Sequence, residues 1–395
     1  MKGVNSLIIG LFGCLVNNEN MGCVALTFSL IRVLEKIARE KGEIYTYYVF
    51  EVDPNEESRQ LAIEKLNLNE NQMKCYDVSP LFKVRRFVHH LPTGIDSLKA
   101  LQKCDCTIDL TAGDSFTDIY GQYIFDGETN VKLLIKKFGK KLILGPQTYG
   151  PFSSEQNIKK AQKAIEQADL VISRDKKSKD YVLNFSKKDV YVTTDLAFDL
   201  PYSNEKTLLS SKIKVGINVS GLLIEEKTEK TSLSVKLRTD YCKYIGFVID
   251  WLLEKEMYDV YIIPHVGRDG TDYIKKLYGD KLHYLDAFVD PISAKNVISQ
   301  MDIFIGARMH ATVAAFSSGV ATIPTAYSRK FTGLFLNLGY PYTIDLVNDA
   351  TNENYFKTIE YITDYQKLQE KVRVGMNKVD ELSEVTYSLL LEILG

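Results

Sequence analysis

The stretches EQADLVISRD at residues 166–175 and SQMDIFIGAR at residues 299–308 follow one pattern in the two halves of the chain. Each contains a helix end, a Gln, an apolar residue and an Asp, and continues into an apolar strand and a polar turn with an arginine. The pattern places Arg174 and Arg308 just beyond the C-terminal ends of two predicted parallel strands. Because open α/β sheets bind ligands at that edge, each half is expected to bring one guanidinium to a ligand.

Short runs rich in β-branched and aromatic residues alternate with helical stretches along the whole chain, and the amphipathic segment 21–41 is one predicted helix. Such alternation is typical of βαβ units and a parallel sheet. The predicted strands are SLIIGLFG, IYTYYVF, CTIDLTAG, KLILGPQ, LVISRD and VYVTTDL in the first half, and IKVGINVS, YDVYIIPH, MDIFIGAR and VATIPTAYS in the second. We therefore predict an α/β protein whose two domains face a central cleft.

The length of 395 residues favours two domains over one core. The polar, turn-rich stretch PYSNEKTLLSSK at residues 201–212 separates the halves. We expect an N-terminal domain at 1–203 and a C-terminal domain at 204–363. No strand follows the periodic segment 364–395, so we expect it to be a helix that packs back on the first domain.

The composition is that of a globular enzyme, with 45% apolar and 25% charged residues. A net charge of only −2 gives no indication of nucleic acid as a partner. The sequence has no apolar stretch of membrane-spanning length and no signal peptide, so we expect a cytoplasmic protein. The six cysteines form no paired CxxC motif, and we expect no metal and no resident cofactor. The sequence leaves open whether the chain forms a homo-oligomer.

The segment KVRRFVHH at residues 83–90 is basic with interleaved apolar residues. A solvated surface is the ordinary interpretation of such a segment. Contact with an anionic glycolipid, or with the inner face of the cytoplasmic membrane, is the alternative interpretation. The sequence does not decide between the two.

The segment GARMHA at residues 306–311 places Arg308 and His310 at the start of a predicted helix, where an anion is favoured. The alternative is that Arg308 pairs with a local carboxylate and that His310 makes one hydrogen bond to the backbone at the start of the helix. The next predicted strand is followed by YSRKF, which brings Arg329 and Lys330 to the same edge, unless this is a solvated basic turn. His265 either lines the cleft or caps the next helix.

Polar and glycine-rich loops after the strands of the first half are the candidates for holding sugar hydroxyls. Asp114 could act as a base or orient a sugar hydroxyl, and it could equally be a helix N-cap. The predicted acceptor-binding residues are Gly13, Asn17, Asn20, Gly22, Asp114, Ser115 and Gln147.

Six motifs together resemble the polysaccharide pyruvyl transferase family and span residues from about 10 to 335. They are GLFGCLVNNENMGCVAL, GPQTYGPF, ISRDKKS, TTDLAFDLP, GARMHA and YSRKF. The resemblance implies two Rossmann-like domains as in glycosyltransferase-B enzymes, with phosphoenolpyruvate as co-substrate. It implies a pyruvate ketal on a sugar of a glycan or lipid-linked saccharide. By the family's pattern, Arg174, His310 and Lys330 are donor-site and catalytic residues.

Two loops depart from the family's pattern. Cys23 stands where the family usually has an aspartate, and Thr111 and Ala112 stand where it usually has glycines. Both departures fall in the N-terminal domain, which by the resemblance receives the acceptor, while the C-terminal domain binds the donor. We expect Cys23 not to act as a nucleophile, because ketal formation needs no thiolate.

The proposed chemistry also suits the residue types. Phosphoenolpyruvate carries a carboxylate and a phosphate, which suit Arg174, Arg308, Arg329 and Lys330, and His310 can move a proton. We expect Arg174, His310 and Lys330 to lie at strand ends and outside the core. The alternatives are a nucleotide-sugar glycosyltransferase of the same fold and a non-catalytic glycan-binding relative.

Overall fold

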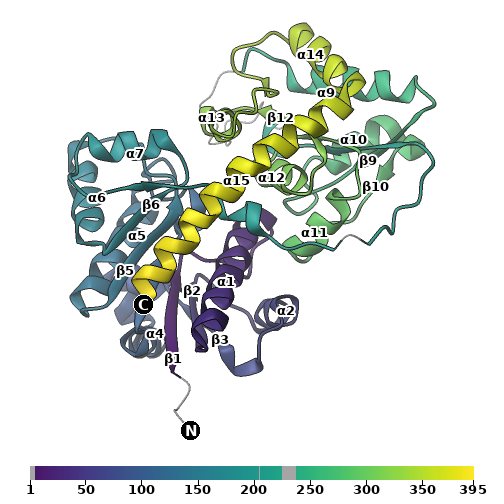
Figure 1. The fold of residues 1–395 in the computed structure, drawn as a ribbon. Helices are drawn as coiled ribbons and strands as arrows, with labels where there is room; N and C mark the ends of the chain where they lie inside the picture. The colour runs from purple at the N-terminus through teal and green to yellow at the C-terminus, as the bar shows by residue number, and fades with distance from the viewer. Residues whose placement is uncertain (1–4, 204, 225–236) are drawn as a thin grey trace. The chain divides into compact units, whose positions relative to one another are not determined.

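The computed structural model of the chain describes residues 5–203, 205–224 and 237–395 (Figure 1). These residues form two compact units. The first unit contains the described residues up to Asn18, together with Cys23–Leu196 and Glu381–Gly395. The second unit contains Glu19–Gly22 and the described part of Ala197–Asp380.

Seven parallel strands form the sheet of the first unit, in the order β3-β2-β1-β4-β5-β6-β7 (Figure 1). The strands are β1 Ser6–Phe12, β2 Ile44–Glu51, β3 Met73–Asp77, β4 Cys106–Asp109, β5 Lys141–Gln147, β6 Leu170–Ser173 and β7 Tyr191–Val192. The order reverses between β1 and β4, as in a Rossmann fold, and such folds bind ligands at the C-terminal strand ends beside that reversal.

The helices of the first unit pack on this sheet through an apolar core that includes Phe12, Phe50 and Leu144. They are α1 Met21–Lys41, α2 Glu56–Leu66, α3 Val84–His89, α4 Leu91–Lys103, α5 Gln122–Lys137, α6 Glu155–Gln167 and α7 Lys176–Leu183. The last turns of α15 (Tyr365–Leu394), drawn yellow in Figure 1, also belong to this unit. Their carbonyl groups accept hydrogen bonds from the ammonium groups of Lys41 and Lys141, each at 2.8 Å.

The second unit repeats this topology with six parallel strands in the order β10-β9-β8-β11-β12-β13. Its strands are β8 Ile213–Asn218, β9 Tyr258–Ile262, β10 His283–Tyr284, β11 Ile303–Gly306, β12 Ala321–Ala326 and β13 Ile344–Asp345. Its helices are α8 Gly221–Ile224, α9 Tyr241–Leu253, α10 Thr271–Tyr278, α11 Pro291–Ile298, α12 Met309–Ser317, α13 Arg329–Asn337, α14 Thr351–Thr363 and the first part of α15. The core includes Phe304, Ile298 and Ala311.

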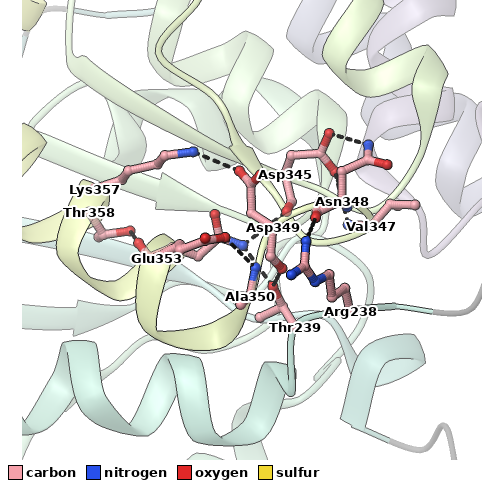
Figure 2. A network of polar contacts seen from close by, with 11 residues as sticks. Arg238, Thr239, Asp345, Val347, Asn348, Asp349, Ala350, Glu353, Lys357 and Thr358 are labelled. Carbon is pink, nitrogen blue, oxygen red and sulfur yellow. Dashed lines mark hydrogen bonds and ion pairs between the residues drawn. The ribbon is translucent and has the colours of Figure 1, made fainter.

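A polar network joins α14 to the start of α9 in the second unit (Figure 2). The Thr239 hydroxyl donates to the Asp349 carbonyl at 2.7 Å, and the Asn354 amide donates to the same hydroxyl at 2.7 Å. Lys357 pairs with the Asp349 carboxylate at 2.8 Å. These bonds satisfy the polar backbone of the segment between β13 and α14, and so fix α14 beside α9.

The predicted α/β fold with two Rossmann-like domains is confirmed, and the predicted helix at residues 21–41 is α1. Three strands were not predicted from the sequence: β3, β10 and β13. Each lies at an edge of its sheet. Two of them have only two residues, which is too few to show an alternating pattern.

The chain passes from the first unit to the second between Leu196 and Ala197, and returns between Asp380 and Glu381. The boundaries expected from the polar stretch and the last periodic segment were 203/204 and 363/364. Phe198, just after the first crossing, is buried and its ring lies 6.0 Å from that of Phe316. No helix among the described residues combines the length and the apolar character needed to cross a membrane.

Lys295 is a buried ammonium group in the second unit. It is 1% exposed and donates to the carbonyls of Leu200 at 2.7 Å and Phe198 at 3.3 Å. Burial lowers the pKa of Lys295 to about 7, and the nearby Asp199 carboxylate opposes this shift. The neutral amine is therefore substantially populated near neutral pH in the folded protein.

We predict that Lys295 makes stability rise with pH above neutrality. Between the folded-state pKa of about 7 and the unfolded value of about 10.4, the unfolded chain binds one more proton, so the free energy of unfolding increases with pH. From pH 7 to pH 9 the wild type should gain about 2 kcal/mol relative to Lys295→Met. Urea unfolding at both pH values measures this difference, and equal changes in the two proteins would contradict it.

Candidate active site

The C-terminal ends of three neighbouring strands in the second unit are tied together by one amide. Asn218, the last residue of β8, donates from its side chain to the carbonyl of Ile263, just after β9, at 2.9 Å. Its oxygen accepts the backbone N–H of Arg308, two residues after β11, at 2.9 Å. Asn218 is 1% exposed. The start of α12 is therefore held rigidly at the sheet edge where ligands are expected.

Arg308 precedes α12 as its N-cap residue and is partly exposed. Its Nε donates to the Asp269 carboxylate at 2.6 Å, and Nη2 contacts the same oxygen. The other oxygen of Asp269 accepts the Gly221 N–H at 2.5 Å. One edge of the guanidinium is thus occupied by a local carboxylate, as the alternative interpretation of Arg308 expected, while the side chain stays 16% exposed.

His310, the second residue of α12, is partly exposed and lies against the backbone of Gly22. A Cβ atom added at Gly22 would come within 2.2 Å of the His310 Nδ1, so no other residue fits there without a shift. The Met21 N–H donates to the carbonyl of His265 at 3.2 Å, and Asn20 forms an isolated bridge with Val266.

These contacts group Glu19–Gly22 with the second unit. The sequence predicts Asn20 and Gly22 as acceptor-binding residues of the N-terminal domain. Their placement in that domain is corrected, because the segment packs on the loop after β9 and on α12, beside His310. The reason is that a loop takes its contacts from tertiary packing and not from the strand that precedes it. The role of Asn20 and Gly22 in acceptor binding stays a prediction.

His265 is 4% exposed, and its Nδ1 has no hydrogen-bond partner among the residues that the structure describes. Burial, with the neighbouring His310 and Arg308, lowers the pKa of His265 to about 3, so its imidazole is neutral at physiological pH. The next helix, α10, has Gly270 as its N-cap, so the capping role proposed for His265 is wrong. His265 instead places its neutral imidazole close to His310 and Arg308.

Arg329 and Lys330 are the first two residues of α13, after β12, which neighbours β11 in the sheet. Ser328 caps this helix by accepting the Phe331 N–H. The side chains of Arg329 and Lys330 lie outside the part of the chain that the structure describes. Their roles stay predictions.

Arg174 lies directly after β6 in the first unit and is 5% exposed. Its Nη1 pairs with the Asp195 carboxylate at 2.7 Å, and its Nε donates to the Thr148 hydroxyl at 2.9 Å. Asp195 is fully buried. The expectation that Arg174 lies outside the core is therefore wrong: a buried carboxylate from the segment after β7 supplies the counter-charge that burial requires.

The loop after β4 has an uncommon backbone. Thr111, Ala112 and Gly113 all have positive φ angles, of 43°, 49° and 86°. Left-handed conformations favour glycine and are outliers for a β-branched residue. The loop therefore keeps the glycine conformation in spite of side chains at two positions. Gly13 packs against it, since a Cβ there would lie 2.4 Å from the Thr111 nitrogen.

A buried ion cluster holds this strained loop. Lys132 of α5 pairs with Asp109 at 3.0 Å, and both side chains are fully buried. The Lys132 ammonium also donates to the Thr111 hydroxyl at 3.0 Å, and that hydroxyl donates to Asp109 at 2.5 Å. Glu128 lies 3.4 Å from the same ammonium. Strain of this kind persists only where surrounding contacts impose it, and it is common at functional loops.

The other predicted acceptor residues differ in what they contact. Asn17 donates to the Asp53 carbonyl at 3.0 Å, and Gln147 is fully buried and donates to the Asp109 carbonyl at 2.9 Å. Both tie strand ends together. Asp114 accepts from the Tyr120 hydroxyl at 3.2 Å and does not cap α5, whose N-cap is Gly121.

Ser115 follows the strained loop and is partly exposed; its N–H donates to the Thr111 carbonyl at 2.9 Å. Asp114 and Ser115 therefore remain the candidates for contact with an acceptor.

Cys23 lies close to Asp114, Arg174 and Asp195 in the first unit. Burial, with the charge of Asp114, raises the pKa of the thiol to about 12, and Arg174 only partly opposes this. The thiolate is therefore scarcely populated near neutral pH. This supports our expectation that Cys23 is not a nucleophile.

We predict that Cys23→Ser keeps turnover within about threefold of wild type, because a protonated thiol contributes no nucleophile. Initial rates of product formation by mass spectrometry measure the effect. Complete loss of turnover with an unchanged circular dichroism spectrum would contradict it, as would a covalent adduct on Cys23 trapped during turnover.

The sequence analysis missed four residues. Lys132 and Asp195 contact the Thr111–Gly113 loop and Arg174, respectively, in the first unit, and Asn218 and Asp269 hold Arg308 in the second unit. Asp195 lies in the TTDLAFDLP motif, and Asn218 ends a predicted strand, so their positions carried a signal. Lys132 carried none, because it stands within a helix next to other lysines. No group of three or more His, Cys, Asp or Glu side chains within residues 5–203, 205–224 and 237–395 is arranged to hold a metal ion.

Comparison with known proteins gives a family and a fold. The sequence matches the polysaccharide pyruvyl transferase family over residues 20–329. No protein with a curated function matches the chain at a significant level.

Solved structures similar in fold include a protein from Listeria monocytogenes assigned as a UDP-N-acetylglucosamine 2-epimerase, with a TM-score of 0.62 and 13% identity over 94% of this chain and 91% of that chain. UDP-GlcNAc 2-epimerase from Neisseria meningitidis, bound to UDP-GlcNAc, has a TM-score of 0.59 and 10% identity over 98% and 100%. A glycosyltransferase from Rickettsia africae has a TM-score of 0.55 and 12% identity over 99% and 98%. These likenesses show a fold of the glycosyltransferase-B type.

Proposed function

Because the chain belongs to the polysaccharide pyruvyl transferase family, we propose that it transfers the pyruvyl group of phosphoenolpyruvate to a sugar of a polysaccharide or glycolipid precursor. The product is a pyruvate ketal that bridges two hydroxyls of that sugar. The observation that carries this proposal is the joint placement of Arg308 and His310 at the start of α12, on the ligand-binding edge of the second sheet.

The donor has two anionic groups, a carboxylate and a phosphate. The N-terminus of α12 favours an anion through its N–H groups and dipole. Arg308 adds a fixed positive charge there, oriented by Asp269 and Asn218. By the family's pattern Lys330, in the first turn of α13, contributes to the same donor site.

The reaction requires a proton donor and a proton acceptor. One proton is added to the methylene carbon of phosphoenolpyruvate, and a sugar hydroxyl attacks the central carbon and loses its proton. A second hydroxyl of the same sugar then attacks that carbon and gives up its proton while the C–O bond to phosphate breaks, which closes the ketal and releases phosphate. We assign the proton transfers to His310, a partly exposed residue at this edge. The neutral imidazole of His265 adds no positive charge beside it.

The acceptor site is assigned to the first unit. Asp114 and Ser115 follow the strained Thr111–Gly113 loop, which Lys132 and Asp109 hold in place. Arg174 lies against this loop, since a Cβ at Gly113 would come within 3.2 Å of its Nη1. Arg174 therefore acts as a positioning residue for the loop, in addition to the donor role that the family's pattern implies.

A nucleotide-sugar glycosyltransferase is the second candidate. One of the solved structures of similar fold is bound to UDP-GlcNAc, and another is a glycosyltransferase. Their identities of 10% and 12% carry the fold alone, so the family assignment favours pyruvyl transfer.

Calorimetric titration distinguishes the two candidates. The protein should bind phosphoenolpyruvate, and Arg308→Gln should weaken that binding at least about tenfold, because a charge-assisted contact is lost. The matched control is Arg268→Gln, which removes a 70% exposed arginine from the loop after β9. Mass spectrometry of a glycan panel incubated with phosphoenolpyruvate should detect the ketal. If UDP-N-acetylglucosamine gave a heat of binding and phosphoenolpyruvate gave none, the pyruvyl transferase proposal would be rejected in favour of a glycosyltransferase.

A further inference from the structure

An apolar stripe with helical spacing lies exposed on the first unit. Val84 and Val88 lie four residues apart on α3, and Leu91 and Ile95 lie four residues apart on α4, with the non-helical His90 between the two helices. This spacing usually marks the face of a helix that packs on the core. Here the four side chains are 83%, 65%, 47% and 37% exposed. The fold leaves this apolar face to the solvent.

Four further apolar and aromatic side chains are exposed beside the stripe, at the start of α5 and in the loop before it. They are Ile119, Tyr120, Tyr123 and Ile124, and they are 39% to 55% exposed. Arg86 of α3 donates to the Tyr123 hydroxyl at 2.9 Å, and the Lys83 ammonium lies 4.7 Å from the centre of the same ring. These contacts bring the start of α5 beside α3. We call the eight exposed residues together the α3–α5 patch.

The patch is bordered by basic side chains. Lys83, Arg85 and Arg86 lie on α3 or directly before it, and Arg85 is exposed. Lys83 lies 3.8 Å from Asp126, so its charge is partly compensated. Apolar residues with cationic neighbours are the pattern of a surface that rests on an anionic membrane. Tyrosine also favours the boundary between lipid and water.

The patch leads directly to the proposed acceptor loop. Tyr120 of the patch donates its hydroxyl to Asp114, at 3.2 Å. A membrane in contact with the patch would therefore lie near the loop assigned to the acceptor.

We propose that the α3–α5 patch docks the protein on a membrane surface rich in anionic lipid, with its apolar side chains in the headgroup region. The inference that docking brings a membrane-bound acceptor near the Asp114 loop rests on the proposed function, but the docking itself does not. This interpretation favours the second of the two alternatives for the basic segment at residues 83–90. A protein partner or a second copy of the chain is the competing occupant, and the experiment below separates them.

Vesicle flotation tests the docking. Vesicles of phosphatidylcholine with 40% phosphatidylglycerol should carry the wild-type protein, and pure phosphatidylcholine vesicles should carry less of it. The double variant Val84→Ser with Val88→Ser should weaken partitioning at least about tenfold, because it removes two of the apolar side chains that enter the headgroup region. Arg85→Gln should weaken it about fivefold on the anionic vesicles only.

The matched control is Leu209→Ser with Val289→Ser, which removes two side chains that are 89% and 74% exposed in the second unit. This control should float as wild type does. Equal flotation of the control and the Val84 and Val88 variant would overturn the proposal. Sedimentation velocity adds a second readout: an oligomer lost only in the Val84 and Val88 variant, without vesicle binding by wild type, would assign the patch to self-association.

Failure of this inference is distinguishable from failure of the proposed function. Vesicle binding is measured without phosphoenolpyruvate, and the calorimetric titration is measured without vesicles. Binding of phosphoenolpyruvate without flotation would overturn the docking alone. Flotation without binding of phosphoenolpyruvate would support the docking and reject pyruvyl transfer.

Discussion

Replacing His310 with alanine is expected to lower the rate of pyruvyl transfer by about 10²- to 10⁴-fold, the usual contribution of a general acid or base. The imidazole stands in the first turn of α12 at the surface of the unit, where it contacts Gly22, so its removal takes away a proton carrier and this contact. Turnover with phosphoenolpyruvate, followed by mass spectrometry of the ketal, measures the loss. The circular dichroism spectrum and the unfolding midpoint should stay close to wild type.

The matched control for this prediction is His283→Ala. His283 is an exposed histidine on β10 of the same unit, where it stacks on Tyr261. It should keep wild-type turnover. Wild-type turnover in His310→Ala would contradict the role assigned to His310. An equal loss of turnover in both variants would show that the substitutions disturb the second unit as a whole.

Replacing Arg174 with alanine is expected to destabilise the protein by about 3–5 kcal/mol, because the fully buried Asp195 would be left without its counter-charge. Urea unfolding of the variant measures the loss. Activity should also fall, since Arg174 contacts the loop that precedes Asp114. An alanine variant alone therefore cannot separate folding from function at this position.

The double variant Arg174→Met with Asp195→Leu separates them. Replacing a buried ion pair by apolar side chains of similar volume is often neutral for stability. The double variant should therefore recover most of the lost stability, while turnover stays low. Recovery of both stability and turnover would show that the arginine serves the fold alone. Wild-type stability of the Arg174→Ala variant would contradict the stabilising role assigned to the buried Arg174–Asp195 pair.

The sequence by itself determined the repeat of the two halves and most of the secondary structure, but not the edge strands β3, β10 and β13. The helix at 21–41 and the strands before Arg174 and Arg308 follow from apolar periodicity, which is a local property. The same is true of the final helix, which was expected at about 364–394 and is observed at Tyr365–Leu394. The parallel pairing of the strands followed because alternating strands and helices are typical of βαβ units; the order of the strands came from the tertiary structure.

The tertiary structure decided the environment of each candidate residue. Arg174 is buried because Asp195 reaches it from another strand end, and Gly22 lies against His310 although they are 288 positions apart in the sequence. The strained loop at Thr111 depends on Lys132, from a helix that carried no visible motif. These pairings join residues far apart in sequence, and periodicity reports only on neighbours along one element. Burial and charge compensation therefore become visible only once the chain is folded.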